Sequence, residues 1–556
     1  MKSFFLLLSG RSKGFFLFIL LVGLMNSILN TTFMVIVGRF IFDANFYVFK
    51  GFDHIGFVVL LLTSLLLNFL FNFYIIRLGA GIIHTVELNL VQRVKRASFM
   101  QFTTMNNSEF YAALSNLRIL GEAPSVFFNL FNSVLTVLCC VGYLYWMSLM
   151  YGIIMTLLIG ILIVSYMLRD RISMLKFERL RKLQVEYYKY IHDLLIGFKD
   201  LKMSHVKNSR IYDEHIRMNK ELQHTTEVGL KKNFAASSVI STYTWYLLLG
   251  IVLFMIPRTA SGAGQISSFV VILLYIIAPL TSITAFFEFY SSLRNALKVL
   301  DAINAKFPET AAIPEEQPSV ALSGPVAQIR FDNVCFDYID SEHGRTFSLG
   351  PVNLELQQGE VVFVIGGNGS GKSTFLNLLT GLVKPSRGVI HFNGHPVLDE
   401  LYDEYRNKLA VVFYDGYLFH FNYEQFTLNA DNEKLARYLR LVQLDGIVNP
   451  DYLLEDRDRL SKGQQKRLAL VLALMMERKV LILDEWAAEQ DPGFKQYFYQ
   501  EIIPLLKEEG VTVIAITHDD EYFSCASRIL KFTDGRFIST NSIKEAALLV
   551  SRLPEN

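Results

Sequence analysis

Two acidic residues stand side by side at the end of an apolar run near the C-terminus. Val480 to Leu483 are apolar, and Asp484 and Glu485 follow them directly in the segment KVLILDEW. Another apolar run, VTVIAIT, ends at His518. In open α/β sheets, ligands bind beyond the carboxyl ends of the strands. Carboxylates and an imidazole at such ends can hold a metal ion or transfer a proton, so these three residues are candidates for catalysis.

A glycine-rich segment upstream indicates the ligand on which these residues would act. VVFVIGGNGSGKSTFLNLL has the G-x-x-x-x-G-K-[ST] spacing of a nucleotide phosphate loop, with an apolar strand before it and a helical pattern after it. Its glycines let backbone N–H groups converge on phosphate oxygens, and the helix N-terminus adds partial positive charge. We therefore predict that ATP and Mg²⁺ bind at this loop, through Gly366, Gly367, Asn368, Gly369, Ser370, Gly371, Lys372, Ser373 and Thr374.

Bound ATP would give the individual side chains distinct roles. Lys372 is expected to contact the β- and γ-phosphates, and Ser373 to bind Mg²⁺. Asp484 would complete the Mg²⁺ shell, and Glu485 would orient or deprotonate the attacking water. A lone histidine is usually structural, but at the end of a third such strand His518 becomes a candidate contact for the γ-phosphate.

A further motif lies between the phosphate loop and the acidic pair. LSKGQQKRLAL begins at Leu460, and its Ser461, Gly463 and Gln464 match the L-S-G-G-Q signature of ABC ATPases. Lys462 replaces the usual second residue of that signature, a glycine, while its neighbours remain. With phosphate loop, signature, acidic pair and histidine in this order, the chain resembles an ABC half-transporter over almost its whole length.

The resemblance implies a dimer with shared ATP sites. In this family two ATPase domains pair head to tail, and each ATP lies between the phosphate loop of one domain and the signature of the other. A chain with one of each is expected to form a two-fold homodimer. The resemblance also implies that Tyr338 stacks on adenine. The signature and D-loop residues expected at the nucleotide are Ser461, Lys462, Gly463, Gln464 and Asp491.

One segment departs from the family at a position that matters for chemistry. VVFYDGYLF aligns with the Q-loop, whose glutamine contacts Mg²⁺ in the family, and here that position is Tyr414. A phenol at neutral pH is a poorer Mg²⁺ ligand than a carboxylate. Either the next residue, Asp415, reaches the metal or the direct contact is lost. The predicted metal ligands are therefore Ser373, Asp484 and Asp415.

Trp486 follows the acidic pair where most ABC proteins have proline. DEWAAEQDP, GQQKRLAL and ITHDDEYF are similar to the cyclic-peptide and siderophore branch of ABC exporters, which includes the syringomycin, pyoverdine and microcin exporters. This resemblance implies that the cargo is a cyclic peptide, a lipopeptide or a siderophore precursor. Trp486 itself is expected to pack behind the acidic pair and to have no chemical role.

The N-terminal half of the sequence predicts a membrane domain. The chain is 52% hydrophobic and 19% charged, which is more apolar than an ordinary soluble protein. Its net charge of +1 does not indicate a nucleic-acid partner, and its four scattered cysteines predict neither a disulfide framework nor a metal site. Six apolar segments are each long enough to cross ~30 Å of hydrocarbon as a helix, namely 14–42, 54–76, 124–146, 149–168, 236–256 and 266–287.

Basic residues gather on one side of these segments. They precede the first, follow the second and follow the fourth, whereas the opposite connections carry almost none. The positive-inside rule puts both termini in the cytoplasm, and the resemblance implies a bacterial inner membrane. Two inner connections are long, 77–123 and 169–234. The second alternates charged and apolar residues at helical spacing, so we expect helices that continue out of the membrane rather than a separate insertion.

A change of composition marks the domain boundaries. Several prolines and small residues over 307–325 predict a linker. Beyond it, short apolar runs alternate with helical patterns, which predicts an α/β domain with a largely parallel sheet. The predicted fold is a membrane α-helical domain of six transmembrane helices, residues 1–306, joined to a cytosolic α/β P-loop ATPase domain, residues 326–556.

The cargo is poorly encoded in the residues themselves. Amide pairs at one-turn spacing, which either bridge helices or line a wet cavity, are Asn26/Asn30, Asn68/Asn72 and Asn129/Asn132. No peptidase domain precedes the first segment, so an already matured cargo is expected. The predicted function is ATP-driven export of a peptide-like product by a homodimer embedded in lipid. A lipid flippase or multidrug exporter is the alternative, and an ATP-gated channel is less favoured because Glu485 and His518 are intact.

Overall fold

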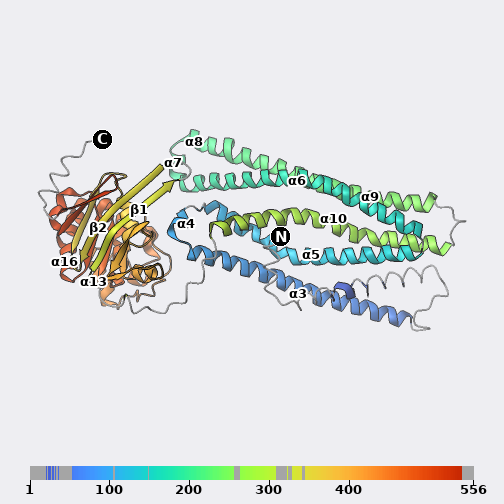
Figure 1. Cartoon of the computed structure of the whole chain (residues 1–556), viewed down its shortest axis with the longest axis horizontal. Coiled ribbons are helices and arrows are strands. Elements are labelled where there is room, and N and C mark those ends of the chain that lie inside the picture. The colour runs from blue at the N-terminus through green and yellow to red at the C-terminus, as the bar shows by residue number, and fades with distance from the viewer. Residues whose placement is uncertain are drawn as a thin grey trace. The chain divides into compact units, whose positions relative to one another are not determined.

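A computed structural model describes residues 53–103, 105, 107–147, 149–255, 263–307, 322, 328–340 and 345–540, with isolated residues between 21 and 36. The chain divides into two compact units, one of Met1–Ala97 with Gln101–Glu309 and one of Ser98–Met100 with Thr310–Asn556. We call them the helical unit and the ATPase unit and describe each by itself (Figure 1).

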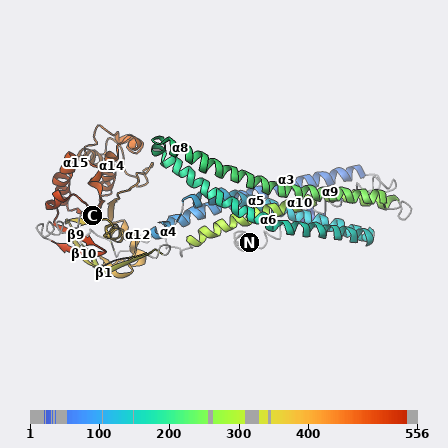
Figure 2. The ribbon, with the colours of Figure 1, turned by 90° about the horizontal axis from the view of Figure 1, so that it is seen from above.

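Long helices make up the helical unit. They are α3 (Asp53–Arg96), α5 (Asn107–Met147), α6 (Leu149–Ile196), α9 (Met218–Met255) and α10 (Ala263–Lys306), with shorter segments α7 (Phe198–Lys202), α8 (His205–Arg210) and the π-helix η1 (Ile211–Arg217). The boundary between the two units falls inside the short helix α4 (Phe99–Thr103). Helix α5 packs against both α3 and α10, and α6 packs against α9 (Figures 1 and 2). Because α6, η1 and α9 cover most of 169–234, the predicted helical extension of that connection is confirmed.

The outer surface of these helices is apolar where a soluble bundle would be polar. On α3, for example, Leu65 and Ile76 are 59% and 66% exposed. Within the described residues, three helical stretches are long and apolar enough to cross a membrane, namely Ile55–Arg96, Leu117–Trp146 and Leu274–Lys306. The predicted segments 149–168 and 236–256 fall on α6 and α9. The predicted first segment lies almost wholly outside the described residues, so the total of six remains a prediction.

One of the predicted amide positions bridges two membrane segments. Asn26 and Asn68 exchange hydrogen bonds, with Nδ2 to Oδ1 distances of 3.0 and 2.9 Å in the two directions. Asn26 is only 5% exposed, and Asn72 turns its Nδ2 back to the carbonyl of Asn68. The sequence left two roles open for these amides, bridging helices or lining a wet cavity. The geometry of this pair is that of helix bridging. Asn30 lies outside the described residues.

The ATPase unit contains two sheets. A six-stranded sheet has the order β10-β9-β3-β8-β7-β6, and its neighbours from β9 to β6 run parallel. A four-stranded antiparallel sheet has the order β2-β1-β4-β5. The strands are β1 (Gln328–Asp340), β2 (Arg345–Gln357), β3 (Val361–Gly366), β4 (Arg387–Phe392), β5 (His395–Pro396), β6 (Leu409–Val412), β7 (Val480–Asp484), β8 (Thr512–Ile516), β9 (Arg528–Thr533) and β10 (Arg536–Thr540).

The helices of the ATPase unit are short. They are α11 (Lys372–Leu379), α12 (Tyr402–Arg406), α13 (Glu433–Leu441), α14 (Lys462–Met475), α15 (Pro492–Tyr497) and α16 (Ile503–Glu508). Short 3₁₀ segments accompany them, namely η3 (Asp399–Leu401), η4 (Pro450–Tyr452), η5 (Asp456–Arg459), η6 (Trp486–Glu489) and η8 (Asp520–Cys525), and the π-helical segment η7 (Phe498–Ile502) joins α15 to α16. The alternation of strands and helices with a largely parallel sheet is the predicted α/β class.

Two apolar cores fix the central strands from both faces. Along β3, Val361 and Phe363 point into one core, and Val362 and Val364 point into the other. All four side chains have no exposed surface. Parallel strands that are covered on both faces need such continuous apolar sequence. The burial holds β3, β7 and β8 rigidly, and it therefore fixes the residues that follow their carboxyl ends.

Candidate functional site

Three neighbouring strands place the predicted catalytic and phosphate-binding residues at one edge of the sheet. β3 ends at the phosphate loop, β7 ends at the acidic pair, and β8 lies between them and leads to His518. The Asp484 position pairs in register with Ile516 of β8. Nε2 of His518 lies 3.4 Å from Oε1 of Glu485. The structure thus brings the histidine and the second carboxylate into direct contact.

The phosphate loop has the backbone shape that its glycines predict. Gly366, Gly369 and Gly371 have φ angles of 155°, 74° and 110°. A Cβ on Gly366 would lie 2.5 Å from both the carbonyl oxygen of Phe532 and Oγ of Ser370, so only glycine fits there. A Cβ on Gly369 would meet nothing within 4 Å, which leaves the mouth of the loop open to a ligand.

Two polar groups in the loop fit a nucleotide phosphate. Nζ of Lys372 donates to the carbonyls of Gly366 and Gly367 at 2.7 and 3.2 Å, although the residue is only 7% exposed. Burial lowers the pKa of Lys372, while the charges of Glu485 and Asp484 oppose that shift. Oγ of Ser370 is buried without a hydrogen-bond partner among the described residues. Phosphate oxygens would satisfy both groups, so the residues present fit ATP.

A pocket of about 440 Å³ lies at this loop, lined by Tyr338, Phe347, Gly367, Asn368, Gly369, Ser370, Gly371, Lys372, Ser373, Thr374 and Glu485. Phe347 was not predicted from the sequence. It pairs across β1 and β2 with Tyr338, the expected adenine-stacking residue. The signal available in the sequence is a second aromatic residue in the strand after Tyr338, and its use requires the register of the hairpin.

The acidic pair combines burial with an unusual backbone turn. Burial raises the pKa of Asp484, and the backbone N–H of Tyr414, which donates to its Oδ2 at 3.3 Å, acts in the opposite direction. Glu485 adopts a left-handed conformation with φ 44° and ψ 35°. Non-glycine residues adopt this conformation rarely and often at functional sites.

The structure fits a Mg²⁺ ion held jointly by protein side chains and nucleotide phosphates better than one held by protein ligands alone. The described residues contain no group of three or more histidine, cysteine or acidic side chains that could hold a metal ion. Mg²⁺ in nucleotide enzymes is usually bound by one or two protein ligands together with phosphate oxygens and waters. Ser373 at the pocket and Asp484 at the neighbouring strand end are suitable donors. Asp415 lines a different pocket.

The signature residues lie apart from the pocket of their own chain. None of Ser461, Lys462, Gly463 and Gln464 lines it within the part of the chain that the structure describes. Ser461 caps α14, with its Oγ accepting from the N–H of Gln464 while Gln464 Oε1 accepts from the N–H of Ser461. Gly463 lies close to the turn that follows the acidic pair, since a Cβ on Gly463 would lie 2.9 Å from the carbonyl of Glu489.

Asp491 also lies outside the pocket. Its Oδ1 caps α15 by accepting from the N–H of Phe494 at 2.9 Å, and its Oδ2 accepts from Nη2 of Arg467 at 2.8 Å. These two interactions lower the pKa of Asp491, the backbone hydrogen bond more than the arginine. The residue is therefore ionised and fixed in orientation at neutral pH.

Trp486 is buried behind the acidic pair, and its predicted packing role is confirmed. It is 2% exposed, and its ring centroid lies 4.4 Å from that of Phe498. Its indole N–H donates to the carbonyl of Lys466 at 2.8 Å. The tryptophan therefore joins the turn after Glu485 to helix α14.

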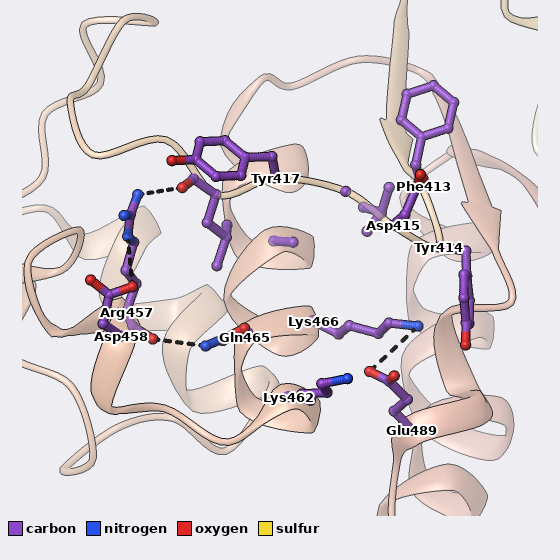
Figure 3. A pocket seen from close by; sticks show the side chains of 14 residues that line it. Phe413, Tyr414, Asp415, Tyr417, Arg457, Asp458, Lys462, Gln465, Lys466 and Glu489 are labelled. Atoms are coloured by element: carbon purple, nitrogen blue, oxygen red, sulfur yellow. Dashed lines mark hydrogen bonds and ion pairs between the residues drawn. The ribbon is translucent and has the colours of Figure 1, made fainter. Parts of the chain in front are cut away.

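Tyr414 and Asp415 lie at a second pocket of about 390 Å³, drawn in Figure 3. Lys462, Lys466 and Glu489 also line it. Tyr414 contacts the acidic pair through its backbone, as described above, and its side chain is 50% exposed. For the Q-loop position, the sequence left open the alternative that the direct metal contact is lost. The exposed side chain of Tyr414 agrees with that alternative.

Comparisons with known proteins agree with these motifs. A family model for the ABC transporter matches residues 349–488, which contain the phosphate loop, the signature and the acidic pair. The chain is 34% identical over 376 residues to the ATP-binding protein SyrD of Pseudomonas syringae pv. syringae, an alignment that covers 64% of each protein. The chain thus matches less than two thirds of that relative's length.

Two other matches differ in how much of the chain they cover. The energy-coupling factor transporter ATP-binding protein EcfA1 of Mycoplasmopsis synoviae (strain 53) is 28% identical over 229 residues, 39% of this chain and 84% of that protein. The solved structure of a bacterial Atm1-family ABC exporter with ATP bound superimposes with a TM-score of 0.74 at 17% identity, covering 97% of both chains. At that identity the similarity establishes the fold, and it extends over both units.

Proposed function

We propose that this chain, an ABC exporter half-transporter by fold and motif, uses ATP hydrolysis to drive the export of a peptide-like product. The observation that carries the proposal is the meeting of phosphate loop, acidic pair and His518 at one sheet edge, in a chain whose other unit has helices long and apolar enough to cross a membrane. The relative SyrD and the Atm1-family structure support the same general activity.

The residues of the site divide the work of hydrolysis. Bound Mg²⁺-ATP supplies the phosphoanhydride bond and the charge neutralisation that phosphoryl transfer requires. The loop N–H groups and Lys372 would hold the phosphates, and Ser373 and Asp484 would hold the metal. Glu485 would accept a proton from the attacking water, and His518, which lies 3.4 Å from the Glu485 carboxylate, would hold that side chain and contact the γ-phosphate.

A homodimer with two shared ATP sites is part of the proposal. The support is the separation of Ser461 and Asp491 from the pocket of their own chain, since a second copy could present both residues to the open side of the bound nucleotide. Purified Lys372→Ala and Ser461→Arg subunits test this arrangement. Each variant alone should be inactive, and mixing them should restore turnover because one site of the heterodimer is intact. Activity in a particle of monomer mass would refute the shared sites.

The cargo and the location are the finer part of the proposal. A cyclic peptide, lipopeptide or siderophore precursor is proposed because SyrD is similar and because the sequence around Trp486 resembles the cyclic-peptide and siderophore branch of ABC exporters. A bacterial inner membrane is proposed from the resemblance to ABC exporters, and a cytoplasmic location of both termini is proposed from the distribution of basic residues. A lipid flippase or multidrug exporter remains the alternative.

Transport in vesicles distinguishes these cargoes. The full chain would be reconstituted into lipid vesicles, and ATPase activity and uptake would be measured with host peptides, labelled lipids and hydrophobic dyes, with Glu485→Gln as the control. The expected result is stimulation and ATP-dependent uptake by a peptide, and neither with Glu485→Gln. Movement of lipids or dyes without any peptide effect would replace the peptide proposal with the alternative. Conductance without turnover would indicate a channel.

A further inference from the structure

A second buried lysine lies near the acidic pair, outside the predicted site. Lys466 is on the second turn of α14 and is 8% exposed, nearly as buried as Lys372 of the phosphate loop. Removing an ammonium group from water is costly unless partners replace the lost hydration. The partners of Lys466 therefore indicate why the residue is charged.

Three different groups surround this ammonium. Its Nζ lies 4.3 Å from the ring centroid of Tyr414, in a cation–π contact. It lies 3.7 Å from Oε2 of Glu489, and it donates to the backbone carbonyl of Glu485 at 3.4 Å. Figure 3 shows the amine between the aromatic ring and the Glu489 carboxylate. The lysine thus joins the Q-loop position to the turn that follows β7.

Lys466 holds that turn at several points. Its carbonyl accepts from the indole of Trp486 at 2.8 Å, so its main chain and its side chain both contact residues 485–489. Glu485 needs such support because it is left-handed, with φ 44°. Its N–H donates to the carbonyl of Ile516 on β8 at 3.0 Å, and its own carbonyl accepts from the N–H of Ala488 at 3.2 Å and from Nζ of Lys466 at 3.4 Å. Both hydrogen-bonding groups of the residue's main chain are thus held, one by the sheet and the other by the turn itself together with α14.

We infer that Lys466 is a positioning residue for Glu485, holding its main chain so that its carboxylate meets the attacking water, and that the ring of Tyr414 holds the lysine in place. This inference rests on the proposed ATP hydrolysis. Tyr414 then influences both acids without binding metal, reaching Glu485 through Lys466 and Asp484 through its own N–H at 3.3 Å.

The decisive measurement separates kcat from KM for ATP in the purified full chain. Lys466→Met removes the charge and keeps the length of the side chain. We expect kcat to fall by about 10²-fold, the size of effect that a small misplacement of a reacting group produces. KM should stay within about twofold, because Lys466 does not line the nucleotide pocket. Lys466→Arg should recover part of the loss, since a guanidinium also stacks on aromatic rings and binds carboxylates.

The aromatic partner gives an independent measurement. Tyr414→Leu, which removes the ring, should lower kcat more than Tyr414→Phe, which keeps it. Adding Tyr414→Leu to Lys466→Met should cause little further loss, because both substitutions interrupt one chain of contacts. Fully additive losses would overturn the inference.

Lys384 offers a matched control in the same unit. Its Nζ lies 5.5 Å from the Tyr402 ring centroid and 3.0 Å from Oδ1 of Asp399, so it has the same two kinds of partner at an exposed position. Lys384→Met should leave kcat unchanged. An equal loss in both methionine variants would show a general effect of removing charge and would overturn the inference.

The remaining outcomes distinguish the inference from the proposed function. A wild-type chain that binds but does not hydrolyse ATP refutes the proposed function first. A hydrolysing wild type with normal kcat in Lys466→Met refutes only the inference, as does a loss of ATP binding together with lower thermal stability. If Lys466→Met does not fold, Glu489→Gln and Tyr414→Leu carry the test, and normal kcat in both overturns the positioning role.

Discussion

The two units differ in the polar groups that they bury. In the described part of the helical unit, the buried polar side chains are uncharged, namely Asn26, Ser133, Thr136, Asn219, Gln223 and Ser291. In the described part of the ATPase unit, four cations are at most 8% exposed, namely Lys372, Arg457, Lys466 and Lys531. Charge is costly to bury in either place, and two of these cations lie where phosphate and carboxylate chemistry is proposed, Lys372 in the phosphate loop and Lys466 beside the acidic pair.

This difference indicates how each unit should respond to substitution. In the proposed mechanism, function in the ATPase unit depends on single charged groups, such as the Glu485 carboxylate 3.4 Å from His518. The helical unit depends on apolar packing shared among long helices and on neutral hydrogen bonds such as the Asn26–Asn68 pair. Single changes should therefore have large effects in the first unit and modest effects in the second.

Glu485→Gln should have the largest effect. Replacing the carboxylate removes the general base, and such a loss lowers turnover by about 10²–10⁴-fold. ATP binding should persist because the phosphate loop is unchanged. Steady-state ATPase assays and nucleotide binding on the same preparation check both points. Turnover near that of the wild type would show that another group accepts the proton.

Two tryptophans compare the units directly in stability. Trp486 is 2% exposed in the ATPase unit, and Trp146 is 74% exposed in the helical unit. Trp486→Ala should reduce the free energy of unfolding by about 3–5 kcal/mol, because it leaves a large cavity and removes the indole hydrogen bond to the Lys466 carbonyl. Trp146→Ala should change it by about 0.5 kcal/mol or less. Thermal unfolding of the full chain in one detergent measures both, and equal losses would contradict the comparison.

The same contrast explains what the sequence could predict. The phosphate loop and the acidic pair are local patterns attached to buried strands, so parallel β3, β7 and β8 bring them together without further information. The burial of Trp486 followed from its place behind a strand end. Lys466 and Phe347 were missed because their roles depend on contacts between distant segments, α14 with the Tyr414 loop and β2 with β1. Amide spacing on the helices left two roles open, and only the pairing of Asn26 with Asn68 distinguished them.

The Asn26–Asn68 pair should show a smaller, compensable effect. Asn68→Leu leaves the Asn26 amide without this partner and should cost about 1–2 kcal/mol. Replacing both asparagines by leucine should recover most of that loss, because no buried amide is then left unpaired. A thermal-stability cycle of the two single variants and the double variant measures the coupling. A stable double variant that loses cargo stimulation would instead show that the pair lines the transport cavity.

Tyr414→Phe should have the smallest effect of all, because among the described residues Tyr414 makes its contacts through its ring and its backbone N–H and not through its hydroxyl. The ring contacts Lys466 at 4.3 Å, the backbone N–H contacts Asp484 at 3.3 Å, and the substitution preserves both. Only the hydroxyl is lost, and a neutral phenol is a weak Mg²⁺ ligand. Turnover should therefore stay within about twofold of the wild type, since removing an exposed polar group away from special features usually has little effect. Asp415→Ala tests the alternative in which this carboxylate reaches the metal, and because Asp415 lines a different pocket its turnover should also stay close to that of the wild type. ATPase assays over a Mg²⁺ titration compare the two variants. A large loss that is recovered at high Mg²⁺ would make the substituted group a metal contact, the hydroxyl in Tyr414→Phe or the carboxylate in Asp415→Ala.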